Sequence, residues 1–429
     1  MRHLSPRTPW IAGCLVAGSC TGTEGDPASS RPANPGDADT DADGDSDIDV
    51  DSGTDTTAQS ETSPVSWALV AGTTRKVCQL VGDDDRELGI ATSNRTDARY
   101  GLWGTDLGAS FGHDGKTWFL FGDALPTGGG TPNPECGDAI AWTEDNDASD
   151  CIDLTFLTDS GGSFQSPEVP GVSLGCYEVP LAGVSADGRM YVWFSTDTMT
   201  RSILARSTDG ARSFSSVRDW SSEHFVNVAV DVAPGGPEWP AGDGDRLVVI
   251  GSGPFRSSHP YLATVPLASV EDAASVRYFG GLDDAGAPIW RDREDLAEPL
   301  FEQPCVGELS AHHDPVMDTW VLLYNCSDPR GIVLRTAPDP WGPWSEAAVA
   351  FEPWNDGGYC HFLHTAWDYD VCDSVHDDGR EYEWGGEYGA YAVAALTRPT
   401  GDGAVISYTM STWNPYTVVL METELAPVE

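Results

Sequence analysis

The chain has 429 residues and a formal net charge of −45, with 68 acidic against 23 basic side chains. A surface this acidic repels phosphate backbones and anionic lipid headgroups, which argues against nucleic-acid binding and against direct attachment to a charged membrane. The chain contains 47 glycines, 30 prolines and 16 tryptophans, and no long stretch has apolar residues at helical spacing. This composition predicts many short strands joined by tight turns.

Residues 1–20 resemble a bacterial lipoprotein signal peptide. Two arginines precede a short apolar run, residues 10–17, which is too short to cross a bilayer. Sequences ending at Cys14 and at Cys20 both resemble lipoprotein cleavage boxes, and we expect Cys20 to be the lipidated residue. Neither cysteine is followed by Asp, which favours the outer membrane. We therefore expect an exported protein, held at the outer membrane or cell surface through the lipid anchor alone.

Residues 21–65 are predicted to form a disordered acidic linker. They hold ten Asp, two Glu and one Arg among Gly, Ser, Thr and Pro, so they can bury too little apolar surface to offset the entropy of ordering. An aspartate ladder starting at Asp39 matches the beginning of an EF-hand loop, but Val50 stands where that loop needs a bidentate Glu. We expect an extended spacer, followed by one folded domain at residues 66–429.

A repeat in this domain predicts a ring of small sheets. Five times an acidic turn precedes a strongly apolar segment, and each such segment is followed by a second predicted strand. Because units this small cannot fold alone, five of them predict an all-β, five-bladed β-propeller; an irregular β-sandwich or two β domains is the alternative. The apolar segments are residues 114–121, 187–194, 243–250, 318–324 and 402–409, and the second strands are residues 152–157, 203–207, 261–265, 332–336 and 417–422.

A short segment containing an acid precedes each apolar segment, and it is predicted to be the innermost strand of its blade. Side chains at the mouth end of these strands point into the axial funnel, so the ring brings several carboxylates together. Glycoside hydrolysis needs one protonated and one ionised carboxyl group, and repulsion in a partly desolvated funnel separates their pKa values. The acids are Asp106, Glu178, Asp231 (which can also point outward), Glu308 and Glu387, and Asp123 ends a central strand near the same funnel.

Sugar binding also needs flat apolar faces with polar tips, and several aromatic residues lie near the predicted mouth. Arg256 and His259 are expected to bond hydroxyl groups at the rim, together with Glu178 and Glu387. For each aromatic ring, packing between blades is the alternative. The aromatic candidates are Trp103, Tyr177, Trp290, Tyr388, Trp413 and Tyr416.

Eight cysteines follow the signal peptide, and an even number in an exported chain favours disulfides. The short-loop pairings are Cys136–Cys151, Cys305–Cys326 and Cys360–Cys372. No Cys/His cluster has zinc spacing, so we expect neither a metal nor a cofactor, and a structural cation such as calcium stays open. A serine-hydrolase elbow, a P-loop and a dinucleotide fingerprint are all missing.

Five motifs between residues 95 and 425 form a familiar combination. They are Gly104-Thr-Asp-Leu-Gly108, Phe121-Gly-Asp123, Gly307-Glu-Leu-Ser310, Val333-Leu-Arg-Thr-Ala-Pro338 with Trp341-Gly-Pro-Trp344, and Ser411-Thr-Trp-Asn-Pro-Tyr416. Together they resemble a bacterial family, DUF4185, in which some members are endo-D-arabinanases that cut the furanose backbone of mycobacterial arabinan. The family is similar in outline to five-bladed propeller glycosidases, where an Asp base and a Glu acid face each other across the funnel.

This resemblance implies that Asp106 and Glu308 occupy the two catalytic positions, with Asp123 as support. The chain departs from the family pattern at Ala124, where Thr is commoner, and in a Cys-rich insertion at residues 360–372. We therefore predict a monomeric glycoside hydrolase that acts on a carbohydrate polymer, with endo-acting arabinanase activity as the specific hypothesis. The alternatives are a non-catalytic glycan-binding propeller on the cell surface and a structural surface protein.

Overall fold

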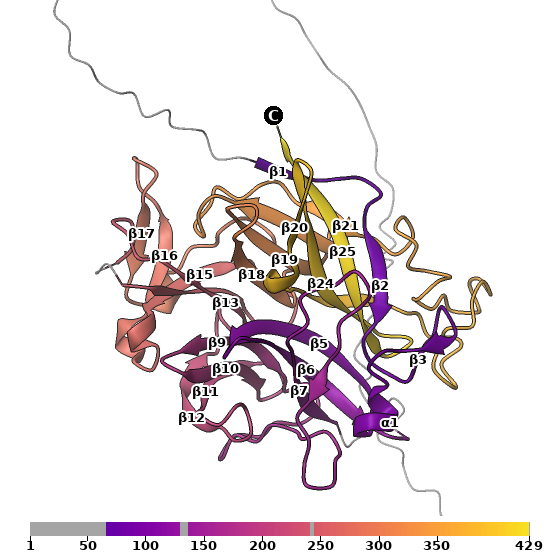
Figure 1. The fold of residues 1–429 in the computed structure, drawn as a ribbon. Coiled ribbons are helices and arrows are strands. Elements are labelled where there is room, and N and C mark those ends of the chain that lie inside the picture. Colours follow the sequence, from indigo (N-terminus) through magenta and orange to yellow (C-terminus); the bar gives the residue numbers. More distant parts are fainter. Residues whose placement is uncertain (1–65, 129–135, 241–243, 429) are drawn as a thin grey trace, which may run out of the picture. The chain divides into compact units, whose positions relative to one another are not determined.

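The computed structural model describes residues 66–128, 136–240 and 244–428 (Figure 1). The signal peptide, the acidic linker and Cys20 lie outside the described residues. Within those ranges, no helix has the length and apolar character needed to cross a membrane. The single α-helix of these ranges, α1 (Thr96–Tyr100), has five residues, so the regular secondary structure of the described residues is mostly β-strand.

Five small antiparallel sheets form the predicted five-bladed β-propeller. The first blade contains β5 (Leu102–His113), β6 (Lys116–Pro126), β7 (Gly137–Thr143) and β8 (Thr155–Phe156). The second contains β9 (Pro180–Ala186), β10 (Arg189–Thr196), β11 (Arg201–Ser207) and β12 (Ser215–Ser221). The third contains β13 (Asn227–Ala233), β14 (Arg246–Ser252), β15 (Tyr261–Pro266), β16 (Arg277–Leu282) and β17 (Pro288–Arg291).

The fourth and fifth blades complete the ring. The fourth contains β18 (Leu309–Asp314), β19 (Thr319–Ser327), β20 (Arg330–Ala337) and β21 (Ala348–Phe351). The fifth contains β22 (Glu387–Ala392), β23 (Arg398–Thr400), β24 (Gly403–Thr412), β25 (Thr417–Val428), β1 (Ser66–Leu69) and β2 (Arg75–Gln79); a separate hairpin joins β3 (Asp84–Asp85) to β4 (Ile90–Ala91). The innermost strands contact one another in the closed circle β5, β9, β13, β18, β22 and again β5.

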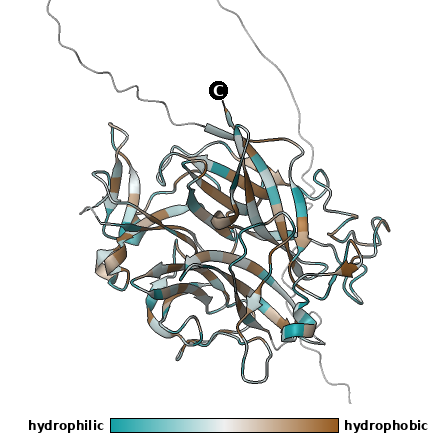
Figure 2. Ribbon diagram, in the orientation of Figure 1, coloured by the Kyte–Doolittle hydropathy of each residue, from teal (hydrophilic) through white to brown (hydrophobic). Residues whose placement is uncertain are grey.

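The hydrophobic core lies between neighbouring blades, because each small sheet has two faces to bury. Leu107, Trp193 and Val249 belong to one buried cluster that joins the first three blades. Val321 and Tyr408 belong to another, which joins the fourth blade to the fifth. The central strands β10, β14 and β19 are buried along nearly their whole length, as expected of sheets covered on both faces, and Figure 2 shows hydrophobic residues on strands throughout the ring.

Strands from the two ends of the described chain close the ring. Both β1 and β2 pair with β25, so the outer part of the fifth blade comes from the start of the domain (Figure 1). A disulfide between Cys78 in β2 and Cys151 beside the first blade links the first and fifth blades across this closure. The start of the domain is thus hydrogen-bonded into the fifth blade through β1 and β2, and the disulfide joins it covalently to the first blade.

Two expectations about the first blade were wrong. The strand after β6 is β7, not residues 152–157, which supply only the two-residue outer strand β8. The Cys136–Cys151 pairing was also wrong: Cys151 binds Cys78, and Cys136 binds Cys176 at the entrance to the second blade. Pairing each cysteine with its nearest neighbour in the sequence fails here, because the ring places the start of the folded domain beside the first blade. The Cys305–Cys326 and Cys360–Cys372 pairings are confirmed.

Candidate active site

Two groups of residues gather at different levels of the propeller axis. A cavity of about 270 Å³ is lined by residues of all five innermost strands, among them Asp231 and His312. Asp106, Glu308 and Glu387 come earlier in the chain than the lining residues of their own blades. The structure therefore separates Asp231, near the far end of the axis, from the acids at the mouth.

Asp106 lies in β5, and its carboxyl group is buried at the mouth end of the axis. The Tyr388 hydroxyl donates a 2.9 Å hydrogen bond to its Oδ2, whereas its Oδ1 is buried with no hydrogen-bond partner among the described residues. Burial raises the pKa of Asp106 well above its usual range, and the charges of Asp123 and Glu308 raise it further. Burial therefore favours the protonated form of Asp106.

Gly104 explains part of the motif around Asp106. A Cβ at this position would lie 2.9 Å from the Tyr416 carbonyl oxygen and 3.0 Å from its ring, so only glycine lets the β24–β25 turn approach β5. This close approach lets the Tyr416 hydroxyl donate to the backbone carbonyl of Asp123 at 3.0 Å. The first and fifth blades are thus in contact beside both aspartates.

Asp123 lies in β6 at a β-bulge and has φ 43°. A bulge re-aims side chains beside active sites, and here the Asp123 Oδ1 accepts a 2.8 Å hydrogen bond from the Tyr177 amide. Burial raises the pKa of Asp123 to about 6; the Tyr177 hydrogen bond opposes this shift and the charge of Glu178 adds to it. Asp123 is therefore ionised near neutral pH and becomes protonated in mild acid.

Asp138 is a site residue that the sequence analysis missed. It is a buried residue of β7, and the Asp123 amide donates a hydrogen bond to its carboxylate. Burial raises its pKa well above the usual range, and the charges of Asp123 and Asp106 act in the same direction. The signal available in the sequence was an acid directly after Cys136-Gly137, but it was overlooked because the second strand was expected at residues 152–157.

Glu308 directly precedes β18, and an arginine from the third blade binds it. Arg256 donates from Nε to Oε2 at 3.1 Å and from Nη2 to Oε1 at 3.0 Å. Gly307 makes room for this pair, since a Cβ there would lie 2.8 Å from the Arg256 Cγ and 2.7 Å from the Asn325 amide nitrogen. The two parallel hydrogen bonds to a guanidinium fix the position and orientation of the Glu308 carboxyl group.

The other predicted acids have local partners. Glu178 accepts hydrogen bonds from the amides of Gly175 at 3.0 Å and Thr198 at 2.9 Å, so it fixes the loop that enters the second blade. Glu387 begins β22 and lies 3.5 Å from the Arg330 Nε; burial raises its pKa and Arg330 opposes that shift. Both stay near the mouth, but neither contacts Asp106 directly.

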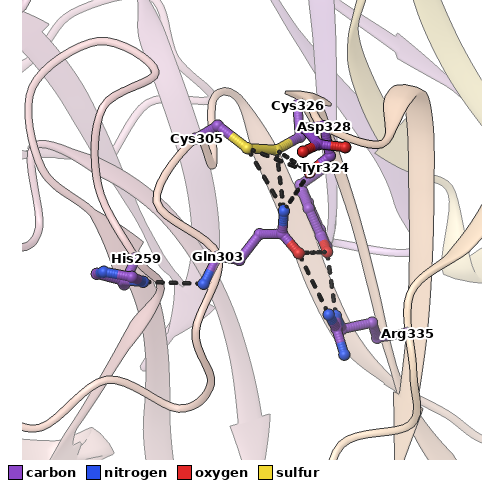
Figure 3. The surroundings of a disulfide bond; sticks show 7 residues. All are labelled: His259, Gln303, Cys305, Tyr324, Cys326, Asp328 and Arg335. Atoms are coloured by element: carbon purple, nitrogen blue, oxygen red, sulfur yellow. Dashed lines mark hydrogen bonds between the residues drawn. A yellow bond between two sulfur atoms is a disulfide. The ribbon is translucent and has the colours of Figure 1, made fainter. Parts of the chain in front are cut away.

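The predicted rim residue His259 belongs to a structural network. Its Nδ1 accepts a 2.8 Å hydrogen bond from the Gln303 amide, and the Gln303 side chain reaches the Cys305–Cys326 disulfide, as Figure 3 shows. Arg335 donates to the same Gln303 side chain at 3.3 Å. His259 therefore anchors the β14–β15 loop that carries Arg256.

Five of the predicted aromatic residues lie in four different environments. Tyr388 lies in the site itself, through its bond to Asp106. Trp103 lines a second cavity, of about 340 Å³, together with Tyr416. The Trp413 indole donates to Glu383 at 2.6 Å and has Arg380 over its ring, whereas Trp290 packs with other tryptophans on the outer strand β17.

A metal ion requires several His, Cys, Asp or Glu ligand atoms that lie close together, and the described part of the chain holds one such cluster. The one cluster with suitable spacing is Cys360, Asp370 and Cys372, and its two sulfur atoms are joined in a disulfide.

The model of one protein family, Domain of unknown function (DUF4185), matches residues 91–422. The chain belongs to this family. All of the mouth residues described above lie inside the matched range, so in DUF4185 terms the candidate site falls within the family domain. No curated protein matches the chain.

Among solved structures, this DUF4185 protein is similar to several sugar-acting enzymes at low identity. A GH43_1 enzyme from Xanthomonas citri has 12% identity and a TM-score of 0.39, with 76% of this chain and 88% of that chain covered. An exo-beta-1,3-galactanase from Phanerochaete chrysosporium has 8% identity and a TM-score of 0.41, with 83% and 65% covered. Similarity at this level assigns neither a substrate nor a reaction.

Proposed function

We propose that the protein is a glycoside hydrolase that acts on a polysaccharide with two carboxyl groups, Asp106 and Asp123. One observation carries this proposal. The two aspartates lie together at the mouth of the axis. Burial raises the pKa of Asp106 well above its usual range, which favours its protonated form, whereas the pKa of Asp123 is about 6, so Asp123 is ionised near neutral pH. A protonated acid beside an ionised carboxylate is the arrangement that cleavage of a glycosidic bond requires.

In this mechanism Asp106 protonates the oxygen of the leaving sugar. Asp123 then either removes a proton from the attacking water or attacks the anomeric carbon itself. Tyr388 orients the Asp106 carboxyl group through its 2.9 Å hydrogen bond. Glu308, held by Arg256, lies at the same mouth and contributes to the electrostatic environment of the sugar ring. The family resemblance implied that Asp106 is the base and Glu308 the acid, but the Arg256 clamp on Glu308 favours the roles proposed here.

We propose arabinan as the substrate, cut at internal linkages, because the chain is a DUF4185 protein and some members of that family are endo-D-arabinanases. The four disulfides support folding in an oxidising compartment outside the cytoplasm. A lipid anchor at Cys20 and the acidic linker would hold such an enzyme, as a monomer, at the outer membrane or cell surface.

The deciding experiment is incubation with D-arabinan and, separately, with L-arabinan, followed by chromatography of the released oligosaccharides. The wild-type protein is compared with Asp106→Asn, Asp123→Asn and Glu308→Gln. Release that the first two substitutions abolish supports the hydrolase. Binding without release supports a glycan-binding propeller instead, and release that persists in Asp106→Asn and Asp123→Asn overturns the assigned roles.

A further inference from the structure

The long connection between β21 and β22, residues 352–386, carries an unusual number of exposed aromatic side chains. In Figure 1 it forms loops between the fourth and fifth blades, with no strand of its own. Trp354 is 46% exposed, Tyr369 67% and Trp384 38%. Several exposed tryptophan and tyrosine side chains in one segment are typical of a binding surface.

These rings form one cluster, which we call the aromatic rim: Trp354, Tyr359, Tyr369 and Trp384. The Trp354 ring centroid lies 4.6 Å from that of Tyr359, 5.8 Å from Tyr369 and 6.1 Å from Trp384. Tyr369 and Trp384 are in turn 5.1 Å apart. The rings support one another, so the surface is already ordered before a ligand arrives, which lowers the entropic cost of binding.

The aromatic rim is continuous with the candidate active site. The Tyr359 hydroxyl accepts a 2.7 Å hydrogen bond from Arg330, whose Nε lies 3.5 Å from Glu387 at the start of β22. The next residue, Tyr388, donates to Asp106. A chain of direct contacts therefore runs from the exposed rings to the proposed catalytic acid.

The charge of the connection restricts what can bind there. Residues 352–386 contain nine acidic side chains and one arginine, a net charge of −8. Such a segment repels polyanions, including glycans rich in uronic acids or phosphate, and favours an uncharged ligand. Sugar rings that present C–H groups on one face and hydroxyl groups at the edges fit aromatic faces flanked by polar tips.

We propose that the aromatic rim is a binding site for a neutral polysaccharide, which it holds while a further part of the same chain occupies the mouth. This assignment rests on the proposed function for the continuity between rim and mouth, but binding at the rim does not require hydrolysis. It predicts that the rim increases the affinity of the protein for polymers. The affinity for short oligosaccharides should not depend on the rim, because these ligands occupy the mouth alone.

The test is affinity electrophoresis of the full chain in gels that contain arabinan, xylan, mannan, β-1,3-galactan or hydroxyethyl cellulose. It is carried out in the Asp106→Asn background, so that the polymer is not degraded. Trp354→Ala and Trp384→Ala are compared with Leu282→Ala, an exposed residue of β16 in the third blade. We expect at least one polymer to retard the parent, about tenfold weaker affinity in both Trp variants, and no change in the control.

A second measurement separates failure of the rim from failure of the hydrolase. In the catalytically intact protein, the two Trp substitutions should raise KM for the polymer about tenfold and leave cleavage of a trisaccharide unchanged. If a polymer retards the protein through the aromatic rim but the protein hydrolyses none of the polymers, the proposed function is refuted and the assignment of the rim as a binding site stands. If no polymer retards the protein, or if the Trp variants bind as the control does, the rim assignment is overturned. The same holds if light scattering shows that the rim only joins two copies of the chain.

Discussion

Arg256 and Glu308 form a two-pronged ion pair between the third and fourth blades, with hydrogen bonds of 3.1 and 3.0 Å. The side chains are 21% and 8% exposed, so most of the hydration of both charges is lost. Two charges removed from water depend on each other, because neither has a second ionic partner of comparable geometry among the described residues. The pair therefore fixes the β14–β15 loop to the mouth and keeps a negative charge facing Asp106.

Substitution of Arg256 by Met should destabilise the protein by about 3 kcal/mol, because it leaves the Glu308 carboxylate buried without its counter-ion. The free energy of unfolding, measured by chemical denaturation, tests this value. The double variant Arg256→Met/Glu308→Gln should recover a large part of the loss. If the two single losses simply add in the double variant, the residues do not stabilise each other.

Asp106→Asn and Asp123→Asn should each lower kcat for polysaccharide cleavage by about 10³-fold, since each removes a group that handles a proton or forms a bond in the transition state. Steady-state kinetics on the polymer provides the measurement. Asp231→Asn is the matched control, because Asp231 lies at the far end of the axis. An equal loss in the control would mean that activity depends on the fold of the whole ring and not on the mouth carboxyl groups.

The activity should depend on pH in a bell shape. Asp123 must be ionised, and its pKa is about 6, so kcat/KM should fall as the pH is lowered through about 6. Asp106 must be protonated, so activity should fall again as the pH rises above its strongly raised pKa. Profiles measured with Glu178→Gln should shift the acidic limb to lower pH, because the charge of Glu178 contributes to the raised pKa of Asp123. An acidic limb near pH 4 in the wild type would contradict the role of Asp123.

Asp123→Asn should make the protein more stable at pH 7 and not at pH 4. The folded-state pKa of Asp123 is about 6 against an ordinary value of 3.8, so burial favours the protonated form. The corresponding stabilisation is complete below pH 3.8 and is lost as the pH rises to 6; it amounts to about 3 kcal/mol. Calorimetry of both proteins at the two pH values measures the difference. A variant that is less stable than the wild type at pH 7 would show that Asp123 stabilises the fold.

Removal of the Cys78–Cys151 disulfide should destabilise the protein more than removal of Cys360–Cys372. The first closes a segment of 73 residues and the second one of 12, and cross-links across longer segments restrict the unfolded chain more strongly. The chain-entropy relation gives about 4 and about 3 kcal/mol, respectively. Melting of the two Cys→Ser double variants under identical conditions compares them. The reverse order would show that Cys78–Cys151 adds nothing to the closure of the ring.

The propeller could be predicted because the repeat that indicates it can be recognised within short stretches of the sequence. An acidic turn followed by an apolar strand recurs five times, and four of the five second strands lie where expected. The exception is the first blade, where β7 follows a Pro- and Gly-rich stretch of sequence; β7 was missed, and Asp138 was missed with it. Asp106 and Asp123 were found because both are acids beside glycine at a predicted strand.

Contacts between residues of different blades could not be predicted from this local repeat. Nothing in the sequence near Glu308 indicates that Arg256, some fifty positions earlier, binds it. The Cys78–Cys151 bond depends in the same way on ring closure, which places the start of the domain next to its first blade. Local periodicity defines the sheets, whereas pairings across the ring depend on how the sheets are arranged in space.

The pairing of β1 and β2 with β25 also sets an order for folding. The fifth sheet combines residues 66–79 with residues 417–428, so it cannot assemble until the final strand is available. Until then the early strands have no partner, and the growing ring presents bare hydrogen-bonding edges on which chains can aggregate. The domain should therefore complete its folding late and in one cooperative step. A chain that lacks its last dozen residues should be degraded by proteases and should not accumulate as a stable four-bladed propeller.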